Sequence, residues 1–184
     1  FVPEDIGIMG GTDRSNISYL GASISFDAVD CTPEQLPILC ELNIANASPT
    51  SDTGDGWIRT YNFPSTSQNT FYPYTLEGGD NNQAEVVDFL TGQDFTISGE
   101  GQKAIMMSGN AFGRQVAKQA FTSNVSLPTV TPFNFGMSKL FIDADSDTWG
   151  TTQVSNTLLK ANFKYVSKIV AKASAEGNGN FFSY

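Results

Sequence analysis

Carboxylates are the residues of this sequence with the clearest capacity for chemistry. Three of them, Glu77, Asp80 and Glu85, lie in the stretch YTLEGGDNNQAE. Two carboxyl groups whose pKa values are held apart can serve as general acid and base. The tetrapeptide Gly78-Gly79-Asp80-Asn81, however, is typical of a turn. The pattern therefore favours a structural connector over a catalytic loop.

A second acidic cluster, Asp143, Asp145 and Asp147 in IDADSDTWG, is spaced like the start of a calcium-binding loop. Such a loop needs glycine at its sixth position and a bidentate glutamate at its twelfth. Here glycine falls at the eighth position and Val154 occupies the twelfth. The sequence therefore favours a solvated turn, and we expect no metal ion.

Other catalytic residue types are scarce. Histidine is absent, which excludes Ser-His-Asp and Cys-His nucleophiles and the usual zinc ligand. Cys31 and Cys40, the two cysteines, suggest no disulfide framework. Arg59 and Arg114 are most simply assigned to surface ion pairs. No phosphate-binding glycine motif occurs, so we expect no enzyme and no cofactor.

Length and charge narrow the class of protein further. The 184 residues, 40% of them hydrophobic, are enough for one domain spanning 1–184. Ten basic residues against 19 acidic ones give a net charge of -9, which disfavours tight binding of nucleic acid. No apolar run is long enough to span a membrane as a helix. Since the chain lacks an initiating methionine, we expect it to be a piece of a longer polypeptide.

The elements that would position these residues are mostly strands. Apolar residues alternate from Ile17 to Val29, which predicts a half-buried strand. The segment TPEQLPIL then combines a capping threonine, an early proline and Gln35, and it predicts a short helix over Pro33 to Ile44. AEVVDFLTGQDFTISGE predicts either one strand bent at residues 91–93 or two strands in succession. KAIMMSGNAFGRQV and MSKLFIDAD predict further strands. NTLLKANFKYVSKIVAKA fits both strand alternation and, through its lysines, helical spacing, and its aromatic and β-branched residues favour a strand.

A long polar region over Ser48 to Tyr74 contains one predicted strand, Trp57 to Phe63. Its aromatic residues lie in segments too rich in proline and serine to bury them. We therefore expect an extended loop that contacts a partner. The candidate interface residues are Trp57, Phe63, Phe71, Tyr72 and Tyr74. The whole pattern predicts a mainly β fold, an antiparallel β-sandwich or barrel with one short flanking α-helix.

The order of these segments resembles that of the tail tube (major tail) proteins of long-tailed bacteriophages. The resemblance spans roughly Asn16 to Gly177. It is carried by TPEQLPIL, NTFYPYTLEGGDNNQAEVVDF, DFTISGEG, AIMMSGNAFGRQV and SKLFIDAD, and most specifically by YTLEGGDN followed by AE and, about thirty residues later, FGRQV.

The resemblance implies a structural virion protein, assembled in the host cytoplasm and located in the tail. Its subunits would form hexameric rings that stack into a tube. Tape measure, tail terminator and tail tip proteins would be its partners, and genome DNA would pass through the lumen without tight binding. The acidic excess agrees with such a lumen because like charges repel. We expect Lys160, Lys164 and Lys168 to point into subunit contacts or solvent.

Two alternatives account for much of the same sequence. A tube protein of a contractile tail or of a type VI secretion system shares the implied fold. A carbohydrate-binding β-sandwich module would explain the acidic β composition and the exposed aromatic residues.

Overall fold

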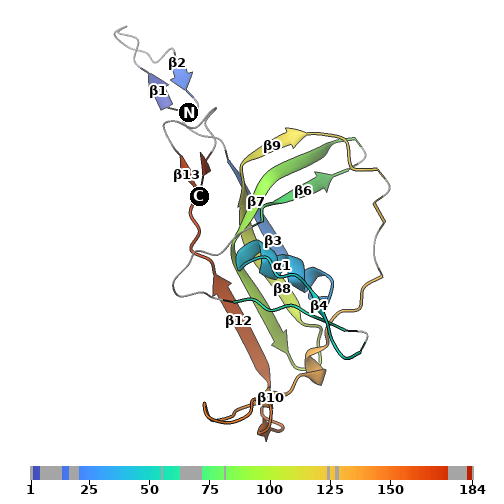
Figure 1. Ribbon diagram of the computed structural model, residues 1–184. Helices are drawn as coiled ribbons and strands as arrows, with labels where there is room; N and C mark the ends of the chain where they lie inside the picture. Colours follow the sequence, from blue (N-terminus) through green and yellow to red (C-terminus); the bar gives the residue numbers. More distant parts are fainter. Residues whose placement is uncertain are drawn as a thin grey trace.

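The computed structural model of the chain is mainly β with a single α-helix among the residues it describes, as the sequence predicts (Figure 1). The structure describes residues 2–4, 14–16, 21–54, 56–62, 72–80, 82–123, 125–126, 129–173 and 182–183. The elements are β1 (Val2–Glu4), β2 (Arg14–Asn16), β3 (Ala22–Asp30), α1 (Gln35–Asn43), β4 (Thr50–Ser51), β5 (Trp57–Ile58), β6 (Tyr74–Gly79), β7 (Ala84–Glu100), β8 (Met106–Gly113), β9 (Gln115–Lys118), η1 (Phe135–Met137), β10 (Leu140–Phe141), β11 (Gln153–Val154), β12 (Lys160–Val166), β13 (Lys172–Ala173) and β14 (Phe182–Ser183).

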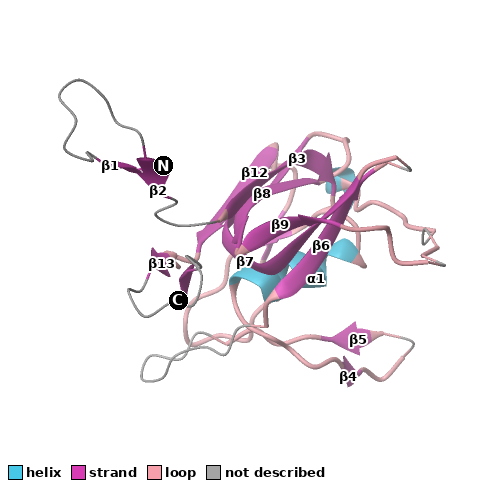
Figure 2. Ribbon diagram, turned by 90° about the horizontal axis from the view of Figure 1, so that it is seen from above, coloured by secondary structure: helices cyan, strands magenta, loops and turns pink. Residues whose placement is uncertain are grey.

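The 17-residue strand β7 organises the sheet. Its second half pairs with β12 on one side and β8 on the other, and β3 follows β8, so the strand order is β12-β7-β8-β3. Its first half pairs with β6 and β9. All these pairings are antiparallel, and six strands therefore form one sheet that is folded over along β7 (Figures 1 and 2).

The hydrophobic core lies between the two parts of this sheet and α1. Its centre consists of Leu42 from α1, Val87 and Leu90 from β7, and Ala111 from β8. Half-buried residues from β3 and β6 pack around it. Because the helix and both parts of the sheet share this core, the arrangement is that of the predicted sandwich with a flanking helix.

The predicted bend in β7 is confirmed. The register with β8 shifts between Gly92 and Asp94, and Phe89 just before the bend has a φ of 56°, which is unusual for an aromatic residue. The Arg114 guanidinium lies 4.0 Å from the Phe89 ring centroid. The surface ion pair expected for Arg114 is therefore replaced by a cation–π contact in the described part of the chain.

Strand β3 and the start of α1 follow their sequence patterns. Ala22, Ile24 and Phe26 are half-buried and the residues between them are exposed, until a bulge after Phe26 ends the alternation. The Gln35 N–H donates to Thr32 Oγ1 at 3.3 Å, and the Thr32 hydroxyl lies 3.3 Å from Gln35 Oε1. Thr32 therefore caps the turn that leads into the helix, whereas the regular helix begins at Gln35 and the residue at its N-cap is Glu34.

Three predicted strands differ from the observed ones. The strand expected from Trp57 is only the two-residue β5, paired with β4. The strand expected in KAIMMSGNAFGRQV is divided at Arg114 into β8 and β9, because β8 pairs with the second half of β7 and β9 with the first. In MSKLFIDAD only β10 is extended and paired, to β11. The segment NTLLKANFKYVSKIVAKA forms the strand β12 over Lys160–Val166 only, and Lys168 lies outside it.

Candidate functional site

The two outer strands of the β12-β7-β8-β3 array are open along their outer edges in the described part of the chain. The open edge of β3 carries only acidic charges, Asp27 and Asp30, and both are exposed. The open edge of β12 carries only basic charges, Lys160 and Lys164, which are also exposed. One sheet thus has an acidic edge and a basic edge on opposite sides.

These edges are also matched in direction. Each of the three pairings between β12 and β3 is antiparallel, so β3 and β12 run in opposite directions. Consider a second copy of the chain whose strands keep the same orientation as those of the first copy. If β12 of that second copy lay beside β3 of the first, the two strands would again be antiparallel. Unpaired N–H and C=O groups on both edges make such pairing favourable.

The face of this array that points away from the core is polar. The cross-strand registers place mainly hydroxyls and amides on that face, together with the apolar Met106, Phe112 and Val166: the polar residues are Ser23, Ser25, Thr96, Ser98, Ser108, Asn110 and Asn162. We call it the polar face. The same registers place three carboxylates (Asp30, Asp94, Glu100) and two lysines (Lys160, Lys164) there. Three minus two gives a net charge of -1, and Glu100 and Lys160 form an ion pair at 3.5 Å.

The predicted interface aromatics are placed differently from one another. Trp57 is 70% exposed on β5, and Tyr72 is 55% exposed just before β6. Tyr74 does not lie on an exposed loop as expected, because it is the first residue of β6 and packs against the core. Phe63 and Phe71 lie outside the described residues.

Glu41 on α1 holds the polar loop against the body of the protein. Its carboxylate forms an ion pair with Arg59 and accepts a hydrogen bond from the Tyr74 hydroxyl. The surface ion pair expected for Arg59 is confirmed, although the Glu41 side chain is only 12% exposed. Burial and the Glu41 hydrogen bond raise the pKa of Tyr74 to about 12.

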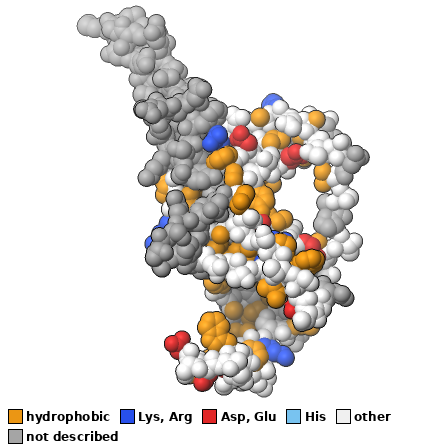
Figure 3. All heavy atoms as spheres, viewed as in Figure 1, with side chains coloured by type: hydrophobic (Ala, Val, Ile, Leu, Met, Phe, Trp, Pro, Cys, Tyr) orange, Lys and Arg blue, Asp and Glu red, His pale blue; other side chains and the backbone are white. Residues whose placement is uncertain are grey.

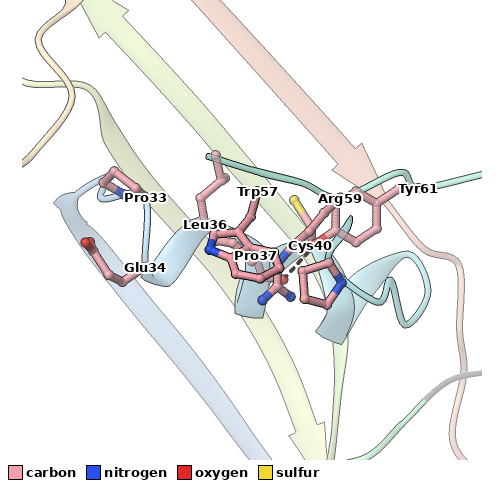
Figure 4. Close-up of a pocket in the computed structure, with 9 residues that line it drawn as sticks. Pro33, Glu34, Leu36, Pro37, Cys40, Trp57, Arg59 and Tyr61 are labelled. Atoms are coloured by element: carbon pink, nitrogen blue, oxygen red, sulfur yellow. Dashed lines mark hydrogen bonds between the residues drawn. The ribbon is translucent and has the colours of Figure 1, made fainter. Parts of the chain in front are cut away.

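A cavity of about 580 Å³ lies between α1 and the β4–β5 hairpin (Figure 4). Trp57, Tyr61 and three prolines contribute to its lining, together with Arg59 and Glu34. The Tyr61 hydroxyl donates to the Pro37 carbonyl at 3.3 Å, which fixes the loop beside the helix. Cys40 also lines the cavity, and burial raises the pKa of its thiol to about 11, so the thiolate nucleophile is disfavoured at neutral pH.

The first acidic cluster stabilises local structure. Asp80 Oδ1 accepts from the N–H groups of Asn82 and Gln83, both at 2.8 Å, and so closes the turn between β6 and β7. Glu77 accepts from the N–H and hydroxyl of Thr122, at 2.9 and 2.6 Å. These hydrogen bonds hold the pKa values of both carboxyls below their usual range. YTLEGGDNNQAE is therefore a β-hairpin with a turn, in agreement with the connector interpretation.

The second acidic cluster is organised around Asp143. Its carboxylate accepts from Gly150 N–H, Thr151 Oγ1 and Thr152 N–H at 2.7 to 2.8 Å, and these bonds close the β10–β11 loop. The hydrogen bonds, that of Thr151 foremost, lower the pKa of Asp143 to about 2. No cluster of potential metal ligands is found among the described residues. The loop agrees with the solvated turn that the sequence favours.

Sequence reasoning missed the opposed charges of the two sheet edges. The alternation of lysine in β12 was visible, but nothing in the sequence shows which strands end the sheet. It also missed large apolar residues that the structure leaves exposed, notably Trp149 (83%), Met137 (82%) and Leu159 (78%). Figure 3 shows hydrophobic side chains gathered on the visible surface, including its lower end.

No protein-family model matches the chain, and neither does a curated protein or a solved structure. Within the described residues, no helix is long and apolar enough to cross a membrane. The class of protein therefore has to be argued from the fold and from the surfaces above.

Proposed function

We propose that this chain is the subunit of a phage tail tube, in which six-membered rings stack around a channel for DNA and the protein has no catalytic role. The observation that carries the proposal is the pair of open, oppositely charged edges on one antiparallel sheet. Identical subunits joined by two different faces form a ring if the rotation closes. A sheet continued from copy to copy would pair the open edges of β3 and β12 all around the ring.

The polar face supports the same proposal because it would line the channel. Its hydroxyls and amides offer DNA no positive patch, and its net charge is negative. Lys160 and Lys164 lie on this face but at its edge, where the acidic edge of the next copy would neutralise them. The expectation that these lysines face subunit contacts is therefore part of the proposal.

Charge reversal tests this assignment. Lys160→Glu with Lys164→Glu makes both edges acidic, and Asp27→Lys with Asp30→Lys makes both basic. Two lost ion pairs and the new repulsion should weaken association by about 2 kcal/mol or more per contact, roughly thirtyfold. Sedimentation velocity and negative-stain images should then show monomers where the unchanged chain forms rings. Lys118→Glu with Lys139→Glu, two exposed lysines elsewhere, changes the net charge equally and should leave rings intact.

Mixing the two reversed variants provides a sharper test. Each acidic edge then meets a basic edge only when the two variants alternate, and a six-membered ring can close with three of each. Rings should therefore return in the mixture and also in a chain that carries all four reversals. Rings that persist in either reversed variant alone, at low salt where electrostatics is strongest, would contradict the edge assignment.

A carbohydrate-binding module is the second candidate, and the cavity beside Trp57 favours it. An exposed indole next to polar groups can stack on a sugar ring while Arg59 and Glu34 bind its hydroxyls. Glycan-array binding that is lost in Trp57→Ala, with a chain that stays monomeric, would support this candidate over the tube.

A further inference from the structure

An apolar slot of about 220 Å³ opens beside the acidic edge of the sheet. Its lining consists of Gln35, Ile38, Leu39 and Leu42 of α1, Phe26 and Val29 of β3, and Met107 and Ser108 of β8, and the exposed surface of this lining is mostly apolar. Ile38 and Val29 at its rim are 52% and 47% exposed. An apolar cavity of about 150 Å³ can hold a benzene molecule, so this slot is large enough for one aromatic ring.

The opposite edge of the sheet carries an aromatic ring on the matching face. Phe163 in the middle of β12 is 55% exposed, and its ring centroid lies 5.9 Å from that of Phe95. Through the registers Phe163–Ile97, Ile97–Met107 and Met107–Val29, it lies on the same face of the sheet as the slot. When β12 of a second copy continues the sheet beyond β3, its Phe163 therefore points toward the slot.

One register satisfies both the apolar and the charged contacts. Opposite β8, β3 has one extra residue between Phe26 and Val29. Suppose that Phe163 of a second copy lies opposite Phe26 in an antiparallel pair. Toward the C-terminal end of β3, the extra residue then puts Lys160 of that copy opposite Asp30. In the other direction, Lys164 of that copy lies opposite Ser25 and near Asp27. Facing pairs of this kind stabilise neighbouring strands.

We propose that Phe163 of one copy fills the slot between α1 and β3 of the next copy and is the apolar anchor of the subunit contact. This inference rests on the proposed ring and names the residue and the pocket that join its members. A buried aromatic side chain in a pocket, surrounded by polar pairs, is typical of the residues that dominate binding energy. The second copy is the occupant that the edge charges, strand directions and register all favour.

The test is a double-substitution cycle on the purified chain. Phe163→Ala removes the ring and Ile38→Asp places a charge at the slot, while both residues are exposed enough to leave the folded monomer intact. Each should weaken association about tenfold or more in sedimentation velocity. Together they should weaken it by clearly less than the product of the two effects, because both act on one contact. Leu159→Ala, an exposed apolar residue next to β12, is the matched control and should have little effect.

Thermal unfolding of the monomers checks that the variants remain folded. Rings that form with Phe163→Ala at the concentration needed by the unchanged chain would overturn the anchor and leave the ring proposal standing. Multiplicative effects of the two substitutions would likewise overturn the contact between them. Absence of rings in every version of the chain, the unchanged one included, would overturn both the ring and the anchor.

Discussion

Docking of α1 on the sheet depends on a glycine, and Gly92→Ala should disrupt it. A Cβ at Gly92 would lie 2.3 Å from Cγ and Oδ1 of Asn43, far inside an ordinary contact. Asn43 is 1% exposed and donates from Nδ2 to the Leu39 carbonyl at 2.9 Å, so its amide has no free space to move into. The helix must therefore shift, or the amide must lose its hydrogen bond.

The magnitude follows from these two routes. Overpacking a core position costs about 1 to 3 kcal/mol, and displacing a buried hydrogen-bonded amide costs about 1 to 3 kcal/mol. Only the cheaper of these two costs is incurred, so we expect Gly92→Ala to lower the free energy of unfolding by about 2 kcal/mol. Urea denaturation followed by circular dichroism measures this directly.

Two further variants isolate the cause. Gly78→Ala on β6 introduces the same methyl group where no atom lies within 4 Å, so it should be neutral or stabilise by up to about 1 kcal/mol. In an Asn43→Ala background the methyl group of Gly92→Ala has room, and its cost should fall by about 2 kcal/mol. Equal costs for Gly92→Ala and Gly78→Ala, within about 0.5 kcal/mol, would refute the close-contact argument.

Two other predictions concern the carboxylates Glu41 and Asp143. Tyr74→Phe removes the hydrogen bond to Glu41 and should destabilise by about 1 to 2 kcal/mol at neutral pH. Since folding raises the pKa of Tyr74 to about 12, its contribution is present below pH about 10 and is lost as pH rises toward 12, so this part of the alkaline fall should vanish in the variant. The Asp143 pKa is lowered to about 2, so its contribution is present above pH about 4 and is lost as pH falls through 2. Asp143→Asn should speed proteolysis in the β10–β11 loop, and calcium should change neither the melting temperature nor that rate.

Sequence patterns correctly predict two kinds of element. One kind depends on hydrogen bonds between residues that are close in sequence, and the other is a strand with only one face against the core. Thr32 and Gln35 predict the start of α1 because capping uses only neighbouring groups. Alternation predicts β3 because only one face of it meets the core. The bend after Phe89 is visible because glycine interrupts a long β-prone run.

The remaining features depend on contacts between distant segments. The break between β8 and β9 at Arg114 arises because β8 pairs with the second half of β7 and β9 pairs with the first half. No local sequence signal shows where this change of pairing occurs. The sequence predicts a loop at Tyr74 because the segment before it is rich in proline and serine, whereas the Tyr74 hydroxyl is held by Glu41 from another element. The open edges of the sheet follow from strand order alone, and so the candidate interface was assigned to loop aromatics instead of to β3 and β12.

The sign of charge on the two edges determines which assemblies the sheet can build. An exposed edge without proline is normally a hazard because it pairs with any other strand. Here two β3 edges repel through Asp27 and Asp30, and two β12 edges repel through Lys160 and Lys164, which disfavours the twofold dimers that like edges would form. Only the unlike pair attracts. In the proposed assembly the same charges therefore disfavour the closed dimer and favour head-to-tail contacts. Head-to-tail contacts are the condition for a ring, and they are also what the mixture of charge-reversed variants tests.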